Sequence, residues 1–198
     1  ETFLELLKGE GFAAPNPRPM FPNPPGLLRL EPHSPGLRER IWWGAASTAT
    51  AVWTAQMGMN LMSSTLLFDE SGEPLHVQQR KQIDAFRAAW KEAGHEREPR
   101  VSVSRSIFAI VNDMDRRYFG GPQQGRDQFG YIEPDKLAVF GRSYAAEPDV
   151  LVEQLKEDSA IEAADTLLLT IPNQLGVDYN AHVLESVVKL VAPELGWR

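Results

Sequence analysis

Two hydroxyl side chains three residues apart, Ser47 and Thr50, form the clearest candidate binding site in this sequence. They follow three small residues, Gly44, Ala45 and Ala46, which we expect to form a turn between a strand and a helix. Such a turn directs several backbone N–H groups and the positive end of a helix dipole at one point, which suits a phosphate group. The alternative is structural, because Ser47 is a good N-cap in any helix and Thr50 can hydrogen-bond locally.

The segments on either side of this turn predict a strand–helix–strand unit. We expect a strand over 41–43, a helix that opens at Ser47 and a second strand over 60–63. The helix has one apolar face, and Gly58 is typical of the position after a helix end. The residues of the apolar face are Ala49, Val52, Trp53 and Met57. The unit therefore carries a candidate anion site at the N-terminus of its helix.

Two further polar residues are candidates for substrate binding. Arg105 lies in a predicted strand, where it either meets an anionic group or points into solvent, since alternate strand residues face opposite sides. Asn173 follows Pro172 at the end of another predicted strand, where it either reaches a substrate or pairs backbone groups of a turn. No residue is identified as catalytic.

Metal ligation and charge clusters offer no further site. The four histidines, His33, His76, His95 and His182, lack the spacing of metal ligands, so no metal is expected. His76 begins a helix, where it either approaches the pocket or, as we expect, has a solvated or capping role. The charged segment 113–117, which includes Asp115, is interpreted as a solvated helix face.

Composition limits the class of protein. The chain has 198 residues, no cysteine and a net charge of −7, as expected for one globular domain that does not bind nucleic acid. No apolar run approaches the ~20 residues of a membrane helix, so no membrane partner is expected. The lack of cysteine fits a reducing compartment, and we expect a cytoplasmic protein.

The first forty residues differ from the rest. The chain opens at Glu1, and its first apolar residues suggest the last turns of an amphipathic helix, so we expect a piece of a longer polypeptide. The proline-rich stretch 15–38 is predicted to be an irregular insertion or lid, with a short strand at 27–30.

The middle of the chain predicts a helix, a strand and a second, short helix. A helix that buries Ile83, Phe86 and Trp90 is predicted to end at Gly94. A strand is predicted over 100–111, followed by a short helix that Asn112 or Asp113 caps.

The last third predicts two helices and one strand. Residues 121–146 are expected to be loop with some helix, and Pro148 to begin the next helix. The apolar run 166–171 is predicted to be a strand buried on both faces, and 179–192 to be the last helix. This alternation predicts an α/β fold with parallel strands and crossover helices, either as an open sheet or as half of a barrel.

The segment Ala46–Gly58 (ASTATAVWTAQMG) resembles the bacterial luciferase-like monooxygenases, whose turn after strand five reads E-S-x-S-T-T-E-W-A-A-Q-x-G. Later segments, such as FGRSYAAEPDVLVEQL and AADTLLLTIPNQLGVDYNAHVLE, are also similar. The resemblance implies that Ser47 and Thr50 contact a flavin phosphate. It also implies that the following strand, with Met62 and Ser64, passes beside the flavin ring.

The resemblance covers the C-terminal half of the family's (β/α)8 TIM barrel, strands five to eight. It implies a flavin-dependent oxidoreductase or monooxygenase that uses FMN, or alternatively coenzyme F420, on a small-molecule substrate. The family's catalytic histidine lies in the other half, so we expect that N-terminal half, or a homo-oligomer, as the partner. The alternative from another class is a flavin-free or catalytically silent barrel subunit with a binding or structural role.

Overall fold

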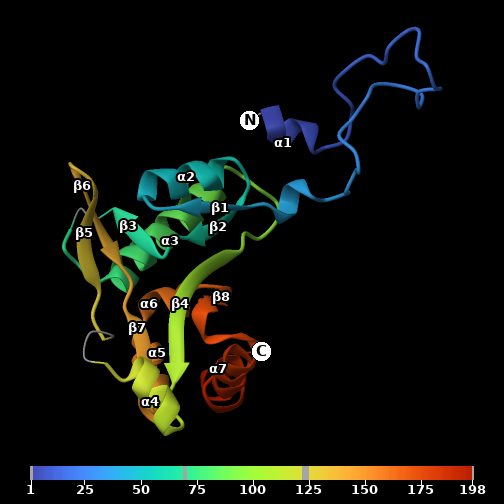
Figure 1. Cartoon of the computed structure of the whole chain (residues 1–198). Coiled ribbons are helices and arrows are strands. Elements are labelled where there is room, and N and C mark those ends of the chain that lie inside the picture. Colours follow the sequence, from blue (N-terminus) through green and yellow to red (C-terminus); the bar gives the residue numbers. More distant parts are fainter. Residues whose placement is uncertain (1, 69–70, 122–124, 198) are drawn as a thin grey trace.

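The computed structural model describes residues 2–68, 71–121 and 125–197 and has a mostly parallel sheet at its centre (Figure 1). Within the described residues, this sheet has five strands in the order β1-β2-β4-β7, and β8 also pairs with β4. All of these pairings are parallel. The strands are β1 (Trp42–Ala45), β2 (Asn60–Ser63), β4 (Val101–Ala109), β7 (Ser143–Ala146) and β8 (Thr166–Leu169). The predicted α/β class with parallel strands is confirmed.

The predicted strand–helix–strand unit is confirmed, but its first strand, β1, spans Trp42–Ala45 and not 41–43. Strand β1 continues to Ala45, because Gly44 pairs with Met62 and Ala45 pairs with Ser63 of β2. These two small residues are therefore strand residues, and the turn is shorter than predicted. Helix α2 (Thr48–Gln56) follows, and a positive φ of 66° at Gly58 ends the unit's helix as expected.

Three helices cover one face of the sheet. They are α2, α3 (Leu75–Glu92) and α6 (Ser159–Ala163). The predicted face of α3 is confirmed, since Ile83, Phe86 and Trp90 pack against strand residues such as Leu61 and Val103. Figure 1 shows α2 and α3 beside β1 and β2, and among the described helices the buried cluster of these strands includes only α2, α3 and α6.

A second core lies around the carboxyl end of β4. It is formed by α5 (Pro148–Lys156) and α7 (Val177–Leu190), which bury Leu151 and Val187 against Ile107. Helix α4 (Asp113–Phe119) is capped by Asn112, and Pro148 occupies the first turn of α5, as predicted. Helix α7 begins two residues earlier than predicted.

Residues 128–146 correct the prediction of a loop with some helix. They form β5 (Gln128–Glu133), β6 (Lys136–Phe140) and β7, and β6 also pairs with β3 (Leu66–Phe68) in an antiparallel sheet. Both faces of β5 are largely exposed, so its residues lack the polar–apolar alternation that marks a half-buried strand. Pro134 and Asp135, between β5 and β6, are typical turn residues and were the available signal.

Strand β8 corrects a second prediction. Its continuous apolar run predicted burial on both faces, but its residues are half-buried or exposed, and Leu168 is 38% exposed. Among the described strands β8 pairs only with β4, so it lies at an edge of the sheet.

The N-terminal segment extends away from the sheet beyond the amino end of β1 (Figure 1). It contains α1 (Thr2–Leu6) and a 3-10 turn, Arg38–Arg40. The short strand expected at 27–30 is only a bridge between Ala13 and Leu28. The Arg38 guanidinium donates to the Met57 carbonyl at 2.8 Å and attaches the segment to α2. A lid role for residues 15–38 stays a prediction. None of the described helices has the length and apolar character needed to span a membrane.

Candidate functional site

The N-terminus of α2 brings the two predicted hydroxyl groups together. Ser47 has extended backbone and caps the helix, and its Oγ accepts from the Thr50 N–H at 3.2 Å. The hydroxyl oxygens of Ser47 and Thr50 lie 3.0 Å apart. The predicted capping role of Ser47 is therefore present, and the two hydroxyl groups contact each other.

Two backbone donors at this helix end have no hydrogen-bond acceptor among the described residues. The first helical hydrogen bond joins the Ala51 N–H to the Ser47 carbonyl, and no described residue accepts from the N–H groups of Thr48 or Ala49. Unpaired donors at a helix N-terminus, together with the helix dipole, attract an anion.

A cavity of about 330 Å³ opens at this point. Residues 46–49 form one side of it, and Leu67 and Phe68 form another. Lys81 of α3 also lines it, with its ammonium 2.6 Å from the carboxylate of Glu73. Because this cation and this anion balance each other, attraction for an anion has to come from the N–H groups, the dipole and the hydroxyls.

The other predicted cofactor residues lie next to this helix end. Ala45 is fully buried, whereas Ala46, Met62 and Ser64 are half-buried. Gly44 is exposed, and a Cβ at its position would meet no atom within 4 Å. The space above Gly44 is therefore open.

Two buried glutamines of α3, which sequence reasoning missed, hold the carboxyl ends of β1 and β2. The Gln82 amide donates to the Ala45 carbonyl at 3.3 Å, and its oxygen accepts from the Ser63 hydroxyl at 2.6 Å. The Gln79 amide donates to the Ser64 carbonyl at 2.8 Å. Both glutamines share the apolar helix face of Ile83 and Phe86, and a polar residue on such a face was the signal to find them.

Arg105 lies in the interior and not in solvent, so the solvent alternative was wrong. Its Nε and Nη2 donate to the Asp158 carboxylate at 2.7 and 3.0 Å, Nη2 also donates to Gln79, and Nη1 donates to the Ser104 carbonyl. The side chains of Arg105 and Asp158 are 3% and 0% exposed. Substrate binding by Arg105 stays a prediction, and its guanidinium already has protein partners.

Asp158 is the centre of this buried network. The Tyr144 hydroxyl donates to it at 2.6 Å, and it caps α6 by accepting from the N–H groups of Ala160 and Ile161. Burial opposes ionisation, but hydrogen bonds and the charge of Arg105 hold the pKa of Asp158 below its usual value. Burial and the Asp158 charge raise the pKa of Tyr144 to about 12.

Asn173, the other predicted substrate residue, begins the 3-10 turn Asn173–Leu175 after β8 and is exposed. Its substrate contact stays a prediction.

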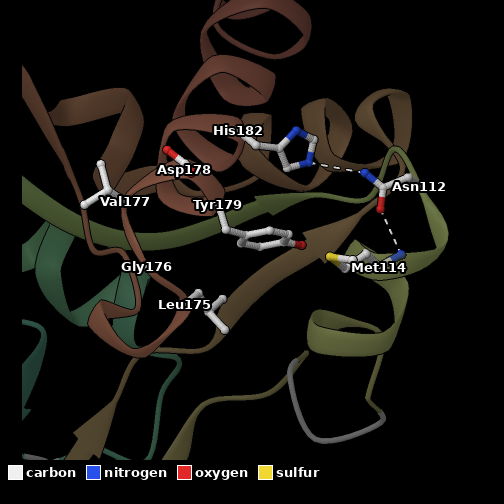
Figure 2. Close-up of a pocket in the computed structure, with 8 residues that line it drawn as sticks. All are labelled: Asn112, Met114, Leu175, Gly176, Val177, Asp178, Tyr179 and His182. Atoms are coloured by element: carbon white, nitrogen blue, oxygen red, sulfur yellow. Dashed lines mark hydrogen bonds between the residues drawn. The ribbon is translucent and has the colours of Figure 1, made fainter.

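A second cavity of about 500 Å³ lies between α4 and the start of α7 (Figure 2). Behind it, Asp115 is only 1% exposed, so the prediction of a solvated helix face was wrong for this residue. The Tyr179 hydroxyl donates to its carboxylate at 2.5 Å, and His182 Nε2 lies 2.9 Å from the same oxygen. The backbone N–H groups of Val111 and Asn112 also donate to Asp115.

The donors around Asp115 determine its ionisation. Burial opposes its charge, but the Tyr179 hydroxyl, the Val111 N–H and His182 together hold the pKa of Asp115 below its usual value. Burial and the Asp115 carboxylate raise the pKa of Tyr179. Asp115 thus ties α7 to α4, and the spacing Asn112–Asp115, a capping box, was the available sequence signal.

The other histidines contact protein groups. His76 Nδ1 lies 3.1 Å from the Ser159 hydroxyl, and His95 Nε2 lies 2.8 Å from the Ala55 carbonyl. No group of three or more histidine, aspartate or glutamate side chains suited to a metal occurs in the described ranges.

Sequence comparisons give no family for the chain. No protein-family model matches it. No curated protein sequence matches it either.

Comparison with solved structures supports the fold. The crystal structure of monooxygenase RslO1 from Streptomyces bottropensis matches 97% of this chain with a TM-score of 0.58 at 15% identity. The structure of apo-MsnO8 matches 89% of the chain with a TM-score of 0.43 at 16% identity. The chain spans 58% of the length of RslO1 and 55% of MsnO8. At these identities, the similarity to RslO1 supports a shared fold and nothing finer.

Proposed function

We propose that the chain is strands five to eight of a luciferase-like (β/α)8 barrel and belongs to a flavin-dependent monooxygenase. In this proposal the parallel neighbours β1, β2, β4 and β8 are those four strands, with the flavin phosphate at the turn after β1. The similarity of the fold to monooxygenase RslO1, of whose chain 58% is matched, supports it. The observation that carries the proposal is the N-terminus of α2, with its paired hydroxyls and unpaired N–H groups.

The residues at this helix end fit a phosphate group. The N–H groups of Thr48 and Ala49 are donors without a described acceptor, and the Ser47 hydroxyl lines the same cavity, with the Thr50 hydroxyl 3.0 Å from it. The ammonium of Lys81 and the carboxylate of Glu73 both line the cavity and balance each other, so the N–H groups, the helix dipole and the Ser47 hydroxyl carry the fit. Both FMN and coenzyme F420 carry a phosphorylated ribityl chain, so this fit suits either; we propose FMN, with F420 as the alternative.

The open face of β1 and β2 is the proposed place for the flavin ring. Gly44 leaves free space, and Met62 is its neighbour in the parallel ladder. Nearby, the Ser102 hydroxyl of β4 is buried without a hydrogen-bond partner among the described residues. An unpaired buried hydroxyl is costly, and we expect a ligand or a further chain segment to contact this face.

A bound reduced flavin supplies hydride transfer or oxygen activation, which no side chain provides. The chain's part is to hold the phosphate and orient the ring. Gln79 and Gln82 support that task because they hold the carbonyls of Ser64 and Ala45 at the carboxyl ends of the two strands.

The proposal includes an N-terminal barrel half as partner. Apolar side chains that a complete barrel would cover are exposed on β8 and α7: Leu168 is 38%, Val177 84% and Val188 61% exposed. A homo-oligomer is the other arrangement that would cover them. We also propose a cytoplasmic location, which the lack of cysteine favours.

Flavin uptake tests the proposed function. We expect the purified chain to quench the fluorescence of added FMN, or of F420, as the ring leaves water. A colourless preparation that is indifferent to both cofactors, also in a longer chain that includes the N-terminal barrel half, would refute the proposal and favour the catalytically silent subunit.

A further inference from the structure

A positively charged cavity of about 280 Å³ lies beside the N-terminus of α3. Arg126, Arg142, His76 and Phe129 contribute to its wall. In the part of the chain that the structure describes, neither arginine lies within ion-pair distance of a carboxylate. The Arg142 guanidinium lies over the Tyr144 ring at 4.4 Å. Because a ring contact leaves its charge in place and no described acid neutralises either guanidinium, both cations attract an anion.

Asp127, the acidic residue of this cavity wall, is occupied by backbone groups. Its Oδ2 accepts from the Leu75 N–H at 2.7 Å, and its Oδ1 accepts from the Arg142 N–H at 2.9 Å. Asp127 therefore joins the segment of both arginines to the first residue of α3. Gly141 lets the chain next to Arg142 lie against Leu75, because a Cβ at position 141 would lie 2.8 Å from a methyl carbon of Leu75.

His76 adds a third donor. The Ser159 N–H lies 3.3 Å from His76 Nδ1, and a backbone N–H only donates, so Nδ1 is the acceptor. In the neutral ring the proton is then on Nε2. No described residue accepts from this N–H.

Charge and shape define the class of ligand. Among the described residues of the wall, two guanidinium groups and one carboxylate leave one net positive charge, although the chain as a whole carries −7. A monoanion matches this charge better than a phosphate dianion. Phe129, 49% exposed, offers an aromatic surface beside the cations.

We propose that this cavity binds the carboxylate of an aromatic acid, with Arg126 and Arg142 on the carboxylate and Phe129 against the ring. Binding of the acid does not depend on the proposed function. Its role as the substrate of the enzyme rests on that proposed function. The enzyme would then act on aromatic acid anions.

Fluorine NMR of 4-fluorobenzoate added to the chain tests the proposal. We expect saturable broadening of its signal, and binding about tenfold or more weaker after Arg142→Gln or Arg126→Gln, because each removes charge-assisted hydrogen bonds. Arg126 is exposed, so its variant is expected to fold normally. Arg117→Gln, an exposed arginine of α4, is the matched control and is expected to bind as the wild type does.

Two further probes separate the outcomes. The neutral 4-fluorobenzamide is expected not to bind, and equal binding of acid and amide would overturn the proposal. Inorganic phosphate and unlabelled benzoate are then compared as competitors of 4-fluorobenzoate. If phosphate displaces it more effectively than benzoate does, the cavity is a phosphate site and the carboxylate proposal is overturned.

The same samples distinguish this proposal from the proposed function. A chain that binds 4-fluorobenzoate but no flavin supports the cavity and refutes the flavin enzyme. A chain that takes up FMN but leaves the 4-fluorobenzoate signal unchanged refutes the cavity alone.

Discussion

The buried ion pair between Arg105 and Asp158 predicts a large loss of stability when its charge is removed. Asp158→Asn keeps a good N-cap for α6 and almost the same volume, but it leaves the Arg105 guanidinium buried without a counter-charge. Loss of one partner of a buried pair costs about 3–5 kcal/mol. We therefore expect the free energy of unfolding, measured by urea denaturation with circular dichroism, to fall by this amount at neutral pH.

The effect of Asp158→Asn is expected to depend on pH. The folded-state pKa of Asp158 is lowered, so its charge stabilises the fold above the unfolded-state pKa of about 3.9, and this contribution is lost as pH falls through the folded-state value. The difference in unfolding free energy between wild type and Asp158→Asn should therefore become smaller as the pH falls below about 3.9.

An exposed pair is the matched control. Glu153 and Lys156 lie 2.8 Å apart with most of both side chains in solvent, so Glu153→Gln should change stability by less than about 1 kcal/mol. Equal effects of Asp158→Asn and Glu153→Gln, or a difference that does not vary with pH, would refute the importance of the buried pair.

Three further substitutions test other parts of the structure. Asp115→Ala should lower the unfolding free energy by about 3 kcal/mol, because it leaves several donors unpaired behind the α4–α7 cavity, and an unchanged urea midpoint would contradict this. Gly141→Ala should cost about 1–3 kcal/mol through its contact with Leu75, whereas Gly121→Ala, with open space, should be neutral in the same assay. Gly44→Ala should leave stability unchanged but weaken FMN binding in a fluorescence titration, and equal FMN affinity would place the ring elsewhere.

Local patterns predicted much of the fold. The apolar face of α3, the strand β4 and the Asn112 cap are each specified by residues a few positions apart, and all three are present. The β5–β6 hairpin was missed because its strands are stabilised by pairing with each other and with β3 and not by a buried face. The exposure of β8 was missed because a hydrophobic run does not reveal how many neighbours a strand has.

For the candidate sites too, contacts between residues close in the sequence were predicted, and contacts between distant residues were not. Ser47 and Thr50 are neighbours in one helix turn, so their spacing was enough to predict that they meet. The partners of Arg105 and Asp115 lie 53 and 67 residues away along the chain, and no local period relates them. Their burial was therefore beyond what the sequence pattern could predict.

Titration of FMN and riboflavin against the Ser47→Ala, Thr50→Ala double variant tests the phosphate site most directly. We expect FMN affinity to fall about a hundredfold, since two hydrogen bonds to a charged group are lost, while riboflavin, which lacks the phosphate, binds wild type and variant equally. Thr2→Ala, at an exposed threonine of α1 that does not line this cavity, should leave both affinities unchanged. Unchanged FMN affinity in the double variant, or an equal loss for riboflavin, would contradict the assignment of the flavin phosphate to the N-terminus of α2.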